Sequence, residues 1–181
     1  MVENQSPKKK FYCLYIKTGC EWNYVKEMQP VLDSPDTPCA GKLYCLGKQM
    51  RLKTGKEYID TLFPSYVFWE TDSLDGLSLL QKGKGFVSLL PQTSEPQQLS
   101  DNDLELIQSF LKYGDVMPIV HVDFDMNDKI QILDGLFKGQ EALVKAVNLR
   151  NKRVNFEVEL MNGTRIIGLT YEVVKRIDTN K

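Results

Sequence analysis

The sequence has few of the residues that metal and disulfide chemistry require. Its 181 residues include one histidine, His121, and four cysteines, none of which form a C-x-x-C pair. A zinc site is therefore poorly supported, and free thiols in a reducing compartment are favoured over a disulfide framework. His121 has no serine, cysteine and acid near it in motif spacing, and no phosphate-binding loop is present. We therefore predict no enzyme activity, no catalytic residue, no metal and no cofactor.

An excess of one charge and a long apolar run are also lacking. The 23 basic and 24 acidic side chains leave a net charge of -1, so any contact with nucleic acid must be local. The apolar run over residues 62–69 contains Pro64 and Ser65 and is far shorter than the roughly 18 residues of a membrane span. We expect a cytoplasmic protein with no membrane partner.

What the sequence does contain is enough apolar area for a folded core. Hydrophobic residues make up 42% of the chain, and residues 11–16 form the aromatic-rich run of a buried strand. Thr18 and Glu21 have the T-x-x-E spacing of a capping box, which predicts a helix that ends or bends at Pro30. Similar patterns predict a basic arm or hairpin over 42–56, an aromatic strand after Pro64, a short helix over 74–80, a strand over 86–90 and a helix from Ser100 to Gly114.

The pattern changes after Gly114, where short strands follow one another without a helical period. They are predicted at 129–133, 142–149, 154–160, 165–169 and 173–177. Five short strands with tight turns predict a small SH3-like barrel. The predicted fold class is α+β, with an N-terminal α/β sandwich of an antiparallel sheet and flanking helices before the barrel. The predicted parts are a disordered lead-in (1–10), an N-terminal domain (11–114), a linker (115–125) and a barrel domain (126–181).

Three segments resemble the NusG family of transcription elongation factors. Residues 11–21, FYCLYIKTGCE, are similar to the strand, turn and helix start of its N-terminal (NGN) domain. Residues 62–68, LFPSYVF, are similar to its Phe-Pro-Gly-Tyr-Val signature, with serine in place of glycine. The Thr-Gly-x-Glu sequence is most similar to the specialised LoaP/RfaH-like paralogues. Residues 128–139, DKIQILDGLFKG, are similar to the start of a KOW motif, with Asp134, Gly135, Phe137 and Gly139 as its motif residues.

The resemblance implies an NGN domain that binds RNA polymerase through the aromatic segment around Pro64. The partner would be the clamp helices of the largest subunit, whose tip would enter an apolar groove. Because strand residues alternate, Tyr66 and Phe68 share one face and Val67 and Trp69 the other, so one face can line the core while the other binds. A strand this apolar can equally be core throughout. The predicted polymerase-binding residues are Tyr12, Tyr15, Phe63, Pro64, Tyr66 and Phe68.

Two groups of basic residues are candidates for nucleic-acid binding. From the residue pattern alone, a solvated hairpin edge and a solvated turn are the simpler interpretations. The resemblance implies instead that these cations lie near the non-template DNA strand or a nascent RNA hairpin and neutralise phosphates. The arm carries Lys42, Lys48, Arg51, Lys53 and Lys56, and a turn of the barrel carries Arg150, Lys152 and Arg153. The partner of the KOW domain is not predicted.

The function implied by the resemblance is that of a transcription elongation factor that binds RNA polymerase and suppresses pausing and termination. Processive antitermination of specific operons is the specialised form of this function. The alternatives are a housekeeping NusG-type elongation and termination factor, and a KOW-containing RNA-binding or ribosomal protein. Ser65 in the signature, Ala142 at a later KOW glycine position, and Met161 at the hairpin tip favour the specialised branch. Housekeeping members carry a phenylalanine near this tip that helps to bind a small-subunit ribosomal protein.

Overall fold

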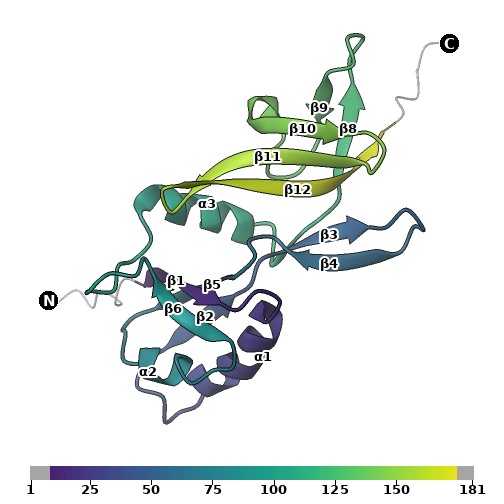
Figure 1. Ribbon diagram of the computed structural model, residues 1–181. Helices are drawn as coiled ribbons and strands as arrows, with labels where there is room; N and C mark the ends of the chain where they lie inside the picture. Colours follow the sequence, from purple (N-terminus) through teal and green to yellow (C-terminus); the bar gives the residue numbers. More distant parts are fainter. Residues whose placement is uncertain (1–8, 175–181) are drawn as a thin grey trace, which may run out of the picture. The chain divides into compact units, whose positions relative to one another are not determined.

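The computed structural model describes residues 9–174, which form two compact units (Figure 1). The N-terminal unit holds residues 9–46 and 63–104, and the C-terminal unit holds residues 47–62 and 105–174. Residues 1–8 of the predicted lead-in lie outside the described residues, and its last residue already belongs to a strand. Within the described range, no helix is long and apolar enough to cross a membrane.

The N-terminal unit is built on a four-stranded antiparallel sheet with strand order β2-β5-β1-β6. In β1 and β5, Tyr15 lies opposite Tyr66 and Cys13 lies opposite Phe68. Figure 1 shows the helices α1 and α2 on one face of this sheet. The elements are β1 (Lys10–Ile16), α1 (Glu21–Leu32), β2 (Gly41–Tyr44), β5 (Tyr66–Thr71), α2 (Leu77–Leu80) and β6 (Phe86–Leu90).

The core of this unit lies between α1 and the sheet. Tyr24, Met28 and Leu32 recur every four residues along α1 and form its buried stripe. They belong to the same cluster as Leu14 and Trp69 of the sheet. The Tyr24 hydroxyl donates to the carbonyl of Leu80 at 2.8 Å, and burial raises the pKa of this phenol above its ordinary value. The sandwich predicted from the sequence is confirmed.

The start of α1 differs from the predicted capping box. The residue before the helix is Cys20, which makes no side-chain capping bond, and the side chains of Thr18 and Glu21 are bonded to Ser65 instead. The helix also continues through Pro30 to Leu32. A proline in the last turn removes one backbone hydrogen bond, and two further residues are tolerated before the helix ends.

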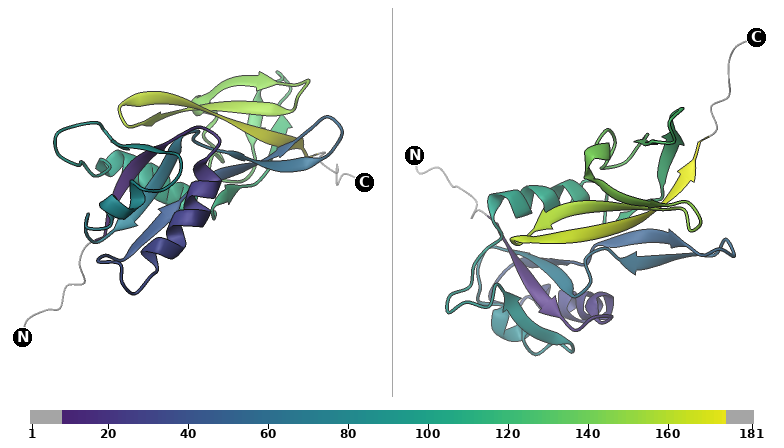
Figure 2. Two further views of the ribbon diagram at one scale, coloured as in Figure 1. Left: turned by 60° about the horizontal axis from the view of Figure 1, so that its bottom comes forward. Right: turned by 45° about the horizontal axis from the view of Figure 1, so that its top comes forward.

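The C-terminal unit holds a five-stranded sheet of order β10-β11-β12-β8-β9 and a three-stranded sheet of order β4-β3-β7. The five-stranded sheet curls into the SH3-like KOW barrel, and Figure 2 shows β11 and β12 as its long twisted hairpin. The elements are β3 (Gly47–Arg51), β4 (Glu57–Thr61), β7 (Val116–Met117), β8 (Val120–Phe124), β9 (Ile130–Ile132), the 3-10 helix η1 (Glu141–Leu143), β10 (Val144–Asn148), β11 (Arg153–Leu160) and β12 (Gly163–Val173).

The helix α3 (Asp101–Leu111) spans the boundary between the two units. Its predicted start is confirmed, because the Ser100 hydroxyl accepts the N–H of Asp103 at 3.3 Å. Gly114 follows with a φ of 100°, which a glycine adopts without steric cost.

The strands of the barrel are not the five predicted from the sequence. The last two predicted strands are not separate, because β12 runs unbroken from Gly163 to Val173; residues 175–177 of the predicted last strand lie outside the described residues. The fifth strand is β8, which pairs in parallel with β12 and antiparallel with β9. Strands β7 and β8 therefore occupy much of the segment predicted as a linker. The predicted domain limits remain a prediction.

The KOW motif residues shape the turn that follows β9. One carboxylate oxygen of Asp134 accepts the backbone N–H of His121 at 2.8 Å, and the other lies 2.5 Å from the Nδ1 atom of the same residue. Gly135 and Gly139 have φ values of 76° and 71°, in the left-handed region that favours glycine. The buried ring of Phe137 stacks on Phe156 with 4.0 Å between centroids. These residues stabilise the barrel from inside.

Candidate functional site

The turn at Pro64 joins the end of the β3–β4 hairpin to β5. The N–H of Tyr66 donates to the carbonyl of Phe63 at 3.1 Å, which closes a tight turn with Pro64 and Ser65 at its centre. Ser65 has a φ of 72°, a conformation that a type II turn requires at this position and that usually calls for glycine. The departure from the family signature therefore falls on a residue that needs compensation.

Three hydrogen bonds hold Ser65 in this conformation. Its N–H donates to a carboxylate oxygen of Glu21 at 2.6 Å, and its carbonyl accepts the N–H of Ile16 at 2.8 Å. Its hydroxyl and that of Thr18 are 2.6 Å apart. Glu21 is 1% exposed, so its bond lies in an environment where an unpaired N–H would be costly. Sequence reasoning noticed the T-x-x-E pair but assigned it to the helix rather than to this turn.

Half of the predicted polymerase-binding aromatic residues lie inside the fold. Tyr12, Phe63 and Phe68 are 5%, 3% and 0% exposed. The ring of Tyr12 packs against Trp69 at 5.8 Å between centroids, and the rings of Phe63 and Phe68 meet edge to face at 6.1 Å. Since these rings already pack against other side chains, they cannot form a binding surface as they stand. They support its backbone from below.

The predicted division of β5 into a core face and a binding face applies only to its first residue. Val67, Phe68 and Trp69 follow one another along the strand, and all three are buried. Both faces of the strand are therefore covered over these residues, as in the core interpretation that the apolar composition also allowed.

Tyr15, Pro64 and Tyr66 are the accessible part of the predicted site. Tyr15 is 37% exposed, Pro64 is exposed and Tyr66 is half-buried. The rings of Tyr15 and Tyr66 face each other across β1 and β5 with their centroids 6.4 Å apart, in an edge-to-face arrangement. We call these three residues the tyrosine surface.

Three of the predicted basic residues are engaged within the fold or lie away from the hairpin. Lys42 belongs to β2 of the N-terminal unit, where its ammonium group lies 4.8 Å from the centroid of the Tyr44 ring. Lys48 pairs with Asp60 at 3.6 Å. Arg153 donates to the backbone carbonyl of Arg51 at 3.0 Å and also to the hydroxyl of Thr170.

Arg51 connects the hairpin to the barrel. Its Nε atom donates to Glu57 at 2.9 Å, and its guanidinium also binds Glu172 of β12. These two carboxylates raise the pKa of Arg51, with Glu172 as the larger cause, and Arg51 in turn lowers the pKa of Glu57. The charge of this arginine is thus balanced inside the unit, and its role is to hold β3 against β12.

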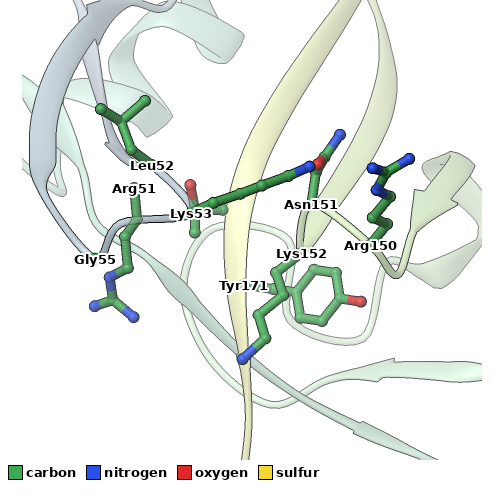
Figure 3. A pocket seen from close by; sticks show the side chains of 9 residues that line it. Arg51, Leu52, Lys53, Gly55, Arg150, Asn151, Lys152 and Tyr171 are labelled. Carbon is green, nitrogen blue, oxygen red and sulfur yellow. The ribbon is translucent and has the colours of Figure 1, made fainter.

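The remaining basic side chains meet at a cleft in the C-terminal unit. The turn between β3 and β4 contributes Lys53, and the turn between β10 and β11 contributes Arg150 and Lys152 (Figure 3). The cleft has a volume of about 250 Å³, and Tyr171 also lines it. The structure thus joins the two basic groups that the sequence presented separately. Lys56 is exposed on the hairpin but does not line the cleft.

The fold and this surface define a two-domain α+β protein with an NGN-type sandwich and a KOW barrel. Comparison with known proteins agrees. The sequence model of one family, described as NusG: Transcription termination factor nusG, matches residues 9–108, which is more than half of the chain. The chain therefore belongs to the NusG family and is a transcription elongation factor. No curated protein matches it in sequence.

Two solved structures share features of this fold. The structure described as "Domain interaction in Thermotoga maritima NusG" has a TM-score of 0.55 and 15% sequence identity, covering 90% of this chain and 94% of that chain. The structure described as "Crystal Structure of MjSpt4:Spt5 complex conformation B" has a TM-score of 0.38 and 14% identity, covering 90% of this chain and 99% of that chain. At this identity the first likeness shows the fold, and the TM-score of the second is too low to support an argument.

Proposed function

We propose that the chain binds RNA polymerase through the tyrosine surface and thereby suppresses pausing and termination. The observation that carries the proposal is the accessible Tyr15–Tyr66 pair beside a turn whose central residue is bonded through its N–H, carbonyl and hydroxyl groups. Tyrosine is common in interface hot spots, because its ring buries a large area while its hydroxyl can still hydrogen-bond. A turn that is already ordered lowers the entropy cost of binding. The proposed partner is the clamp helices of the polymerase's largest subunit.

The proposed mechanism is a population shift. A factor that binds the elongating polymerase more tightly than the paused one favours elongation by the ratio of the two affinities. A tenfold preference corresponds to about 1.4 kcal/mol. No chemical step by the factor is required.

We also propose that the chain is a specialised LoaP/RfaH-like paralogue that acts in processive antitermination of specific operons in the cytoplasm. Ser65 supports this proposal, because its hydroxyl bonds to Thr18, which a glycine could not do. Met161, with a φ of 54°, occupies the tip of the β11–β12 hairpin where housekeeping members use phenylalanine. Polymerase binding is assigned to residues 11–114, and the KOW domain to residues 126–181 with an unidentified partner.

Transcription in vitro across a pause site and an intrinsic terminator tests the proposed function. We expect the wild-type chain to shorten the pause and increase read-through, and Tyr66→Ala to lose most of both effects. Tyr58→Ala is the matched control, because Tyr58 is 40% exposed on β4, away from the tyrosine surface. The proposal fails if the wild type leaves both pause and terminator unchanged, or if the two variants act alike.

A further inference from the structure

The cleft between the two turns of the C-terminal unit is suited to an anion. None of the nine residues that line it is acidic. Lys53, Arg150 and Lys152 are exposed, and within residues 9–174 none of the three forms an ion pair. Arg51 also lines the cleft, but Glu57 and Glu172 balance its charge. Three uncompensated cations therefore face one small volume of solvent.

The size of the cleft and its lining restrict the kind of anion. A volume of about 250 Å³ lies below the roughly 300–1,000 Å³ of sites that enclose drug-sized ligands. The only aromatic side chain of the lining is Tyr171, which is 2% exposed and offers no face for a base to stack on. Cations without an accessible ring bind phosphates and do not read bases.

The two walls of the cleft come from segments far apart in the sequence, and hydrogen bonds hold them together. Arg153 donates to the carbonyl of Arg51 at 3.0 Å, and the Thr170 hydroxyl donates to the sulfur of Met50 at 3.8 Å. In Figure 3 the side chain of Lys53 extends from the hairpin toward the turn that carries Asn151. A chain of phosphates lying in the cleft would be contacted from both sides.

We propose that this cleft is one composite site for the phosphodiester backbone of a single nucleic-acid strand, with Lys53 on one wall and Arg150 and Lys152 on the other. The inference rests on the proposed function only in placing the protein beside nucleic acid at a transcribing polymerase. It assigns backbone binding, not sequence recognition, to these residues. A recruitment sequence would have to be recognised elsewhere.

Fluorescence anisotropy with the full chain tests the proposal without polymerase. The probes are a labelled 12-nucleotide oligouridine RNA, the oligodeoxyuridine of equal length and a 12-base-pair DNA duplex. Three phosphate contacts predict that log K falls with log salt with a slope of about -2 for a single strand, since each contact contributes about -0.7. We expect one strand bound per chain. Binding of either single strand supports the site and identifies whether RNA or DNA occupies it.

Variants of the two walls test whether the site is composite. Lys53→Gln and Lys152→Asn should each weaken the same binding event and reduce the steepness of the slope by about 0.7. Asparagine is chosen because Lys152 has a φ of 50°, which asparagine tolerates. Lys56→Gln is the control and should change affinity less than about twofold, since Lys56 lies outside the cleft.

Several outcomes would overturn the composite site. They are a loss on only one wall, an equal loss with Lys56→Gln, two strands bound per chain, equally tight binding of the duplex, and equally tight binding of a polyglutamate peptide. Failure here leaves polymerase binding untouched, because that proposal is tested with Tyr66→Ala and not with these lysines. Failure with Tyr66→Ala likewise leaves phosphate binding standing.

Discussion

Glu21→Ala is expected to destabilise the N-terminal unit by about 2–3 kcal/mol, because it leaves the buried N–H of Ser65 without an acceptor. The bond is charge-assisted, and the conformation that it supports is one that serine adopts reluctantly. Loosening the turn should also disorder the tyrosine surface, so affinity for polymerase should fall even where the unit remains folded.

Glu21→Gln separates the hydrogen bond from the charge. Glutamine keeps an acceptor oxygen at the same reach, so we expect a cost of about 1 kcal/mol. Glu27→Ala is the control, since Glu27 is exposed on the same helix and its loss should stay within about 0.5 kcal/mol.

Denaturant unfolding followed by tryptophan fluorescence measures this effect. Both tryptophans of the chain, Trp22 and Trp69, lie in the N-terminal unit and report on it directly. Hydrogen exchange at the Ser65 amide adds a local readout and should accelerate in Glu21→Ala. Equal midpoints for Glu21→Ala and Glu27→Ala would show that the buried carboxylate does not support the turn.

Phe137→Ala is expected to destabilise the KOW barrel by about 3–5 kcal/mol, the cost of removing a large aromatic side chain from a packed core. Phe137 is 2% exposed, stacks on Phe156 at 4.0 Å and meets Phe110 edge to face at 6.1 Å between centroids. A loss of this size is comparable with the whole stability of a small domain, so the barrel should be largely unfolded at physiological temperature.

Hydrogen exchange along β11 and β12 measures the effect, because these strands form the centre of the barrel sheet. Ile166→Ala on β12 is the control; Ile166 is 51% exposed, and its truncation should leave the protection of these amides nearly unchanged. Protection in Phe137→Ala equal to that of the control would mean that the KOW phenylalanine is not a core residue.

Much of the fold could be predicted because its elements follow local patterns. The strand over 86–90 and the helix after Ser100 have apolar spacing and end groups that need no distant partner. The limits of the barrel strands were harder. Nothing in the local pattern distinguishes β12 as one long strand, and β8 pairs in parallel with a strand far along the chain.

The site was predictable only in part, because burial and long-range contacts decide it. Phe68 has the same residue type and the same face as an interface aromatic, yet it is fully buried, and local alternation cannot show what covers a strand. The carboxylate of Glu21 bonds to a residue 44 positions away, while its sequence spacing suggested a local cap. Lys53 and Lys152 meet in one cleft only because β3 and β12 are held together by Arg51 and Glu172.

The most direct test of the tyrosine surface is the affinity of the full chain for nuclease-treated core RNA polymerase, compared among wild type, Tyr66→Ala and Tyr58→Ala. Truncating a hot-spot tyrosine typically costs 1–2 kcal/mol or more, so we predict that Tyr66→Ala weakens binding about tenfold or more while Tyr58→Ala changes it less than about twofold. Equal affinities for the three proteins would contradict the assignment of polymerase binding to Tyr15, Pro64 and Tyr66.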